Sequence, residues 1–72
     1  MKTTIVSILP AGYGHNEVTI KYRTGKQYSA VTDNTIATDN YRSDTFTNAD
    51  LHRKKSAERE LINIVKRRHC LA

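Results

Sequence analysis

The chain has 72 residues, a formal net charge of +5 and a single cysteine. A chain of this length forms one small domain, residues 1–72, and buries only about 60% of the surface that its unfolded form exposes. One cysteine excludes an internal disulfide, and the charged, tryptophan-free composition is typical of the reducing cytoplasm.

The first residues predict neither a signal peptide nor a membrane span. The apolar run of residues 5–9 is interrupted by Ser7 and ended by Pro10, so it is shorter than the apolar part of a secretory signal. No stretch approaches the length of about 20 apolar residues that a membrane helix needs. We therefore expect a cytoplasmic location and no membrane partner.

Residues 3–9 predict the first strand, because they are rich in β-branched side chains. Both faces of this strand are partly apolar, so alternation does not choose the inner one. If Val6 and Ile8 face the core, Ile5 and Leu9 lie on the opposite face.

Residues 10–14 combine proline and glycine and predict a turn. The Gly-Tyr-Gly sequence within it resembles part of a phosphate-binding loop. A strand rather than a helix follows, however, so no helix N-terminus is available to hold a phosphate.

Residues 17–22 and 26–32 predict a hairpin whose register depends on its loop. A two-residue turn would place Tyr28 on the polar face. A three-residue loop with Gly25 in a left-handed conformation pairs Ile20 with Tyr28 and Val18 with Ala30. This register puts the large apolar side chains on one face, and we prefer it.

Residues 33–44 show little periodicity. Asn34 is a candidate N-cap for one helical turn over residues 35–37. We expect Ile36 and Tyr41 to anchor this connection to the core.

Residues 48–69 predict the one long helix. Thr47 is the expected N-cap, and Asp50 completes a capping box with aspartate in place of glutamate. Phe46 and Leu51 have the spacing of a hydrophobic staple.

At 100° per residue this helix has one broad apolar side. Basic side chains fill its last turns, where they complement the helix dipole. We expect the chain beyond Arg68 to fray. The apolar side consists of Ala57, Leu61, Ile64 and Val65, with Leu51 and Ile62 at its margin.

The elements together predict an α+β fold: a three-stranded antiparallel meander followed by one long C-terminal amphipathic helix packed on one sheet face. We expect the core to contain Val18, Ile20, Tyr22, Tyr28, Ala30, Phe46, Leu51, Leu61, Ile64 and Val65.

Catalytic and metal-binding patterns are weak. His69 and Cys70 are adjacent, but neighbouring side chains on a helix point about 100° apart and do not converge. The histidines show no zinc spacing, and an EF-hand pattern starting at Asp33 would need an oxygen ligand at Ala37. We expect no catalytic site, metal or cofactor, and predict that the protein is not an enzyme.

The basic charge is unevenly distributed. Residues 1–32 carry four lysines or arginines and one carboxylate. Residues 33–50 carry one arginine and four carboxylates, and residues 51–72 carry seven lysines or arginines and two carboxylates. Two surfaces could therefore attract a polyanion, although a solvated basic surface needs no partner. The candidate residues are Lys21, Arg23, Gln27 and Ser29 on the open sheet face and Lys55, Arg59, Lys66 and Arg67 on the helix exterior.

Two resemblances accompany this pattern. In layout, residues 16–69 resemble the amino-terminal arm-binding domains of tyrosine recombinases, which implies DNA binding through a sheet. The run of residues 28–32 (Tyr-Ser-Ala-Val-Thr), followed by Asn34, Thr35 and Asp39, resembles short bacterial proteins of unknown function, some from mobile elements. The second resemblance implies no activity.

We therefore expect a non-enzymatic binding module whose partner is nucleic acid, bound through the basic sheet face. The alternative is a protein–protein or self-association module. In that case a homodimer would form through Ile5, Leu9 and Val31, which lie together on the open sheet face if Val6 and Ile8 face the helix.

Overall fold

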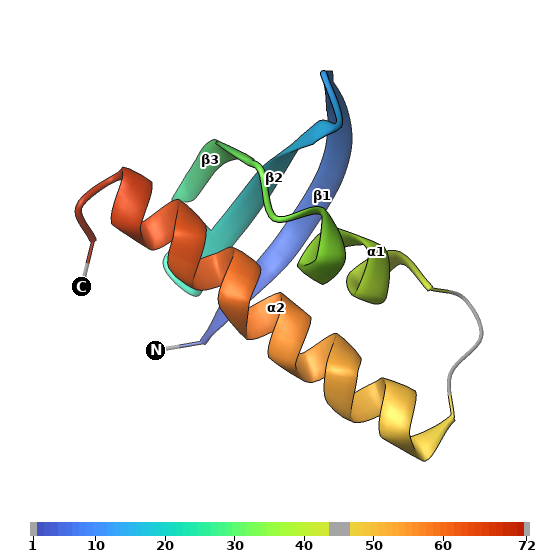
Figure 1. Cartoon of the computed structure of the whole chain (residues 1–72). Coiled ribbons are helices and arrows are strands. Elements are labelled where there is room, and N and C mark those ends of the chain that lie inside the picture. Colours follow the sequence, from blue (N-terminus) through green and yellow to red (C-terminus); the bar gives the residue numbers. More distant parts are fainter. Residues whose placement is uncertain (1, 44–46, 72) are drawn as a thin grey trace.

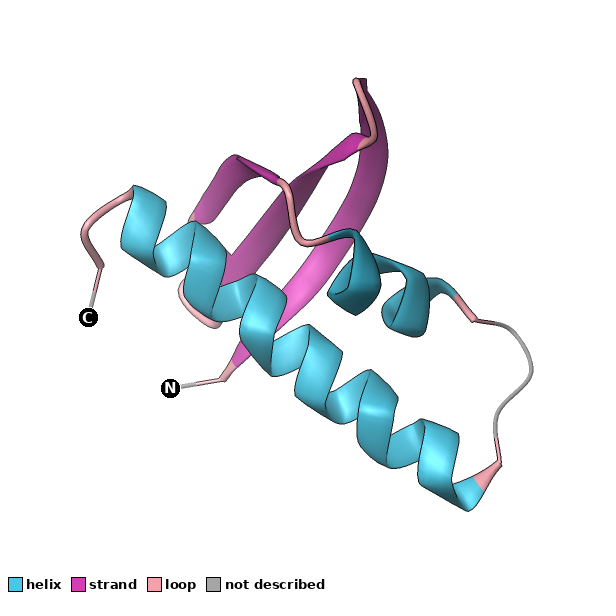
Figure 2. Ribbon diagram, in the orientation of Figure 1, coloured by secondary structure: helices cyan, strands magenta, loops and turns pink. Residues whose placement is uncertain are grey.

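The computed structural model describes residues 2–43 and 47–71. Its sheet has the order β1-β2-β3 and is antiparallel throughout. Figures 1 and 2 show α2 crossing one face of this sheet, with α1 beside it on the same side. The predicted α+β class is confirmed, and α1 is an additional element. The elements are β1 (Thr3–Gly12), β2 (His15–Tyr22), β3 (Gln27–Thr32), α1 (Thr35–Arg42) and α2 (Asn48–Arg68).

The hairpin of β2 and β3 has the predicted register. Ile20 pairs with Tyr28, and Val18 pairs with Ala30. Gly25 has a φ of 94°, and the Tyr22 N–H donates to the Lys26 carbonyl at 2.9 Å across the three-residue loop. Only glycine adopts such a φ without strain, so this residue sets the register of the hairpin.

The hairpin of β1 and β2 is longer than predicted. β1 continues to Gly12, and Pro10 pairs with Asn16, so only the last two residues of the turn predicted over residues 10–14 form it. Proline is tolerated there because β1 is an edge strand. The turn consists of Tyr13 and Gly14, both with positive φ, as a two-residue type I′ turn requires.

A bulge in β1 decides which side chains face the core. Ile5 pairs with Ile20 while Ser7 pairs with Thr19, so Val6 is an extra residue. Ile5 and Ile8 therefore both pack on the core, whereas Val6 is 51% exposed. The prediction that Val6 faces the core and Ile5 the open side was wrong, because it assumed strict alternation.

The core lies between the sheet and the two helices. Leu51 was predicted to belong to it but is 46% exposed, because the first turns of α2 extend past the sheet (Figure 1). Tyr22 and Ile64 are half-buried, and the predicted core residue Phe46 lies outside the described residues. The buried apolar residues are Val18, Ile20, Ala37, Ala57, Leu61 and Val65, with Ile5, Ile8, Tyr28, Ala30, Tyr41 and Ile62 packed against them.

Helix α1 has eight residues rather than one turn. The Asn34 side-chain oxygen accepts from the Ala37 N–H at 3.0 Å, which confirms the predicted cap. The predicted anchor Ile36 is 75% exposed, and Ala37 and Thr38 are buried in its place. Tyr41 packs on the core as expected.

Both ends of α2 are closed by hydrogen bonds. At the N-terminus the Thr47 hydroxyl accepts from the Asp50 N–H, and the Asp50 carboxylate accepts from the Thr47 N–H at 3.0 Å, which confirms the capping box. At the C-terminus the Leu71 N–H donates to the Lys66 carbonyl at 2.8 Å. Cys70 has a φ of 54°, so the helix ends in a Schellman motif. The prediction that the chain beyond Arg68 frays was wrong.

Candidate nucleic-acid interface

One end of the open sheet face gathers basic and hydrogen-bonding side chains. Thr4, Lys21 and Gln27 pair across the three strands and form one row. Arg23 lies in the loop after β2 and is exposed. Lys2, Thr4, Lys21, Tyr22 and Arg23 line a shallow hollow here, and no carboxylate belongs to this lining. We call Lys2, Lys21 and Arg23 the sheet-end cations.

Ser29, which was also predicted for the open sheet face, lies on it in the next row. It pairs with Thr19, and the two hydroxyls are 2.8 Å apart. Because each hydroxyl already has a hydrogen-bond partner, this row is less available to a ligand than Lys21 and Gln27.

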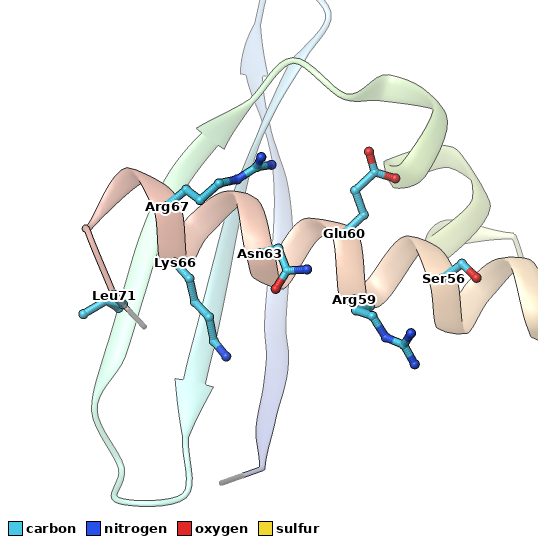
Figure 3. Close-up of a pocket in the computed structure, with 7 residues that line it drawn as sticks. All are labelled: Ser56, Arg59, Glu60, Asn63, Lys66, Arg67 and Leu71. Atoms are coloured by element: carbon cyan, nitrogen blue, oxygen red, sulfur yellow. The ribbon is translucent and has the colours of Figure 1, made fainter.

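The helix exterior forms a second basic surface, shown in Figure 3. Arg59 and Lys66 are directed to one side of α2, toward the end of the sheet where β1 begins, whereas Arg67 and Glu60 are directed to the other side. Arg67, the fourth residue predicted for the helix exterior, lines one hollow together with Arg59 and Lys66. Lys55 joins Arg59 and Lys66 along a neighbouring hollow, which also includes Glu58 and Thr3 of β1. We call Lys55, Arg59 and Lys66 the helix-row cations.

Lys66 links this row to the sheet. It is half-buried, and its ammonium group lies 5.7 Å from the centre of the Tyr22 ring. An aromatic face attracts a cation electrostatically at this range. Tyr22 itself stacks edge-on against Tyr28, with ring centres 5.5 Å apart.

Two arginines outside these rows have acidic partners. Arg53 forms an ion pair with Asp50 at 3.5 Å, and Arg68 approaches Asp33 at 4.0 Å. Within residues 2–43 and 47–71 no ion pair joins a sheet-end or helix-row cation to a carboxylate. The charge of these two rows is therefore available to a ligand.

The other end of the open face is apolar. Leu9, Glu17 and Val31 pair across the strands in one row. Val6 lies at the bulge, and Tyr13 is fully exposed at the turn of the first hairpin. Of the predicted patch of Ile5, Leu9 and Val31, Ile5 packs on the core instead, and Leu9 and Val31 lie on the open face.

Two ionisable groups have shifted pKa values. Backbone and side-chain hydrogen bonds from Thr47 lower the pKa of the Asp50 carboxyl. Burial raises the pKa of the Tyr41 phenol, with a smaller contribution from Glu58. Neither group belongs to the basic surfaces, and both shifts reflect local structure.

The described residues offer neither a metal-binding cluster nor a membrane helix. They contain no group of three or more His, Cys, Asp or Glu side chains that could hold a metal ion. None of their helices is long and apolar enough to span a membrane.

Sequence reasoning missed Lys2 and Thr4 as members of the sheet-end hollow. Their position follows from the pairing of Thr4 with Lys21, which depends on the bulge in β1. The bulge has no signal in the sequence, because both faces of β1 are partly apolar.

Comparison with models of protein families, with curated protein sequences and with solved structures found no match.

Proposed function

We propose that this protein is a non-enzymatic module that binds nucleic acid through the basic end of its open sheet face. The observation that carries the proposal is the hollow lined by Lys2, Lys21 and Arg23, which includes no carboxylate. Cations without acidic partners displace the counterions of a nucleic acid, and this release drives binding.

The row beside these cations could supply base contacts. Thr4, Lys21 and Gln27 present donors and acceptors from three adjacent strands. Base edges in the major groove carry a distinct pattern of donors and acceptors, and strands can enter that groove. The open face is accessible for such contacts because both described helices lie on the opposite side of the sheet (Figure 2).

Fluorescence anisotropy with a short labelled DNA duplex tests the proposal. We expect Lys21→Ala with Arg23→Ala to weaken binding and to flatten the plot of log affinity against log salt by about 0.9 for each phosphate that is no longer bound. The matched control is Arg53→Ala with Arg68→Ala, which removes the same charge from residues that already pair with carboxylates. No binding by the wild-type protein at low salt would reject the proposal.

Self-association is the second candidate function. Leu9 and Val31 are 56% and 46% exposed on the open sheet face, and Val6 at the bulge of β1 is 51% exposed. Exposed apolar patches commonly mark contacts. Sedimentation equilibrium should then show a dimer that Leu9→Lys converts to a folded monomer. A wild-type protein that stays monomeric at high concentration would eliminate this candidate.

A further inference from the structure

The first residues of β1 separate two basic hollows. Successive side chains of a strand point to opposite faces of its sheet. Thr4 lines the open-face hollow with the sheet-end cations, whereas Thr3 lines the hollow on the helix side with the helix-row cations. The two basic surfaces, which lie far apart in the sequence, therefore flank a single strand.

The sheet-end cations belong to the sheet layer and the helix-row cations to α2, which packs on it. Packed layers are typically about 10 Å apart. Lys66 reaches the sheet layer, since its ammonium group lies over the ring of Tyr22 at the end of β2, and Tyr22 also lines the open-face hollow. Lys55 and Arg59 are four residues apart on α2, which places them on one face of the helix in line with Lys66. In Figure 3, Arg59 and Lys66 are directed toward this end of the sheet.

Such an arrangement matches a double strand better than a single strand. A duplex presents two rows of phosphates, which in DNA border a major groove about 12 Å wide. A single strand presents one row and is usually held by exposed aromatic rings on which its bases stack. The aromatic rings near this end, Tyr22 and Tyr28, instead pack against each other beneath α2.

We propose that the beginning of β1 enters a groove of double-stranded DNA, with the sheet-end cations contacting the phosphates of one strand and the helix-row cations those of the other. This inference rests on the proposed function and specifies its ligand as a duplex. Charge complementarity supports it, because both rows lack carboxylate partners among the residues that the structure describes.

The test compares three double variants by anisotropy, each on a duplex and on one of its single strands. Lys55→Ala with Arg59→Ala should reduce the slope of log affinity against log salt for the duplex by about 1.8, since two phosphates are no longer bound. Lys21→Ala with Arg23→Ala should flatten it at least as much. The control, Arg53→Ala with Arg68→Ala, should leave it unchanged. Lys55 and Arg59 are exposed, so circular dichroism should show an intact fold in that variant.

The outcomes separate this inference from the proposed function. Suppose that Lys21→Ala with Arg23→Ala weakens duplex binding and Lys55→Ala with Arg59→Ala does not. This result would overturn the groove arrangement and leave the proposed function standing. Single-strand binding as tight as duplex binding would also overturn it. Absence of wild-type binding to either ligand at low salt would overturn the proposed function itself.

Discussion

The residue that closes α2 is unusual for its position. Cys70 occupies the left-handed position of a Schellman motif, with a φ of 54°. This position usually holds glycine, because a side chain there approaches the backbone too closely. Cys70 therefore carries local backbone strain, and its thiol is exposed.

Replacing this cysteine with glycine should stabilise the protein. A left-handed conformation costs a residue with a side chain about 1–2 kcal/mol, and part of this is offset by the greater freedom of glycine in the unfolded chain. We expect Cys70→Gly to raise the free energy of unfolding by about 0.5–1 kcal/mol in urea denaturation. Cys70→Ala serves as the control that removes only the thiol. Equal stabilities of the two variants would show that backbone strain is not relieved.

The capping box at the other end of α2 makes stability depend on pH. The pKa of Asp50 is lowered from its ordinary value of 3.8 by hydrogen bonds from Thr47. A lowered folded-state pKa stabilises the protein above the unfolded-state pKa, and this stabilisation is lost as the pH falls through the folded-state pKa.

Asp50→Asn should therefore lower the melting temperature at pH 7, and the difference from wild type should shrink as the pH falls below 3.8. Thermal melts followed by circular dichroism from pH 7 to pH 2 measure this. A difference in melting temperature that stays constant over that pH range would mean that the carboxylate charge of Asp50 does not stabilise the fold.

At the scale of elements, both edges of the sheet are capped by side chains from the helices. Arg42 at the end of α1 donates to the Ile8 carbonyl of β1 at 3.1 Å. His69 at the end of α2 donates through Nε2 to the Ser29 carbonyl of β3, 2.6 Å away. Unpaired edge strands can pair with other chains, so these contacts and the bulge at Val6 protect the edges.

Removing the cap on β1 should promote strand pairing between molecules. We expect Arg42→Ala to increase the aggregation rate during prolonged incubation at neutral pH, measured by thioflavin T fluorescence and light scattering. Arg53→Ala removes the same charge without uncovering a strand edge, so it should aggregate like the wild type. Similar rates for the two variants would mean that the missing charge, and not the edge, is responsible.

At the scale of the whole molecule, the charges are segregated. The sheet-end and helix-row cations gather at one end, whereas Asp33 and Asp50 pair locally with arginines elsewhere. The molecule measures 32 × 31 × 16 Å, so at 10 mM salt, where screening acts over about 30 Å, nearly all charges repel or attract one another.

Salt should therefore stabilise this protein, because the net charge is +5 and the clustered cations repel one another. We expect the melting temperature to rise between 10 mM and 300 mM sodium chloride. The rise should be smaller for Lys21→Ala with Arg23→Ala, which removes part of the cluster. A melting temperature that falls with salt would show that attractive pairs dominate.

The sequence alone determined the elements whose signals are local. Thr47 and Asp50 are three residues apart and fix the start of α2, while Gly25 fixes the loop that pairs Ile20 with Tyr28. These signals succeed because a cap or a tight turn depends on residues within a few positions of each other.

The tertiary structure decided everything that depends on contacts between distant segments. The bulge placed Ile5 in the core and Val6 outside, because packing on α2, not alternation, chose the inner face of β1. Leu51 is exposed because α2 is longer than the sheet is wide, although its spacing in the helix fits the apolar side. Likewise, the two basic surfaces meet at Thr3 and Thr4 only once the helix crosses the sheet, since no local signal links the two ends of the chain.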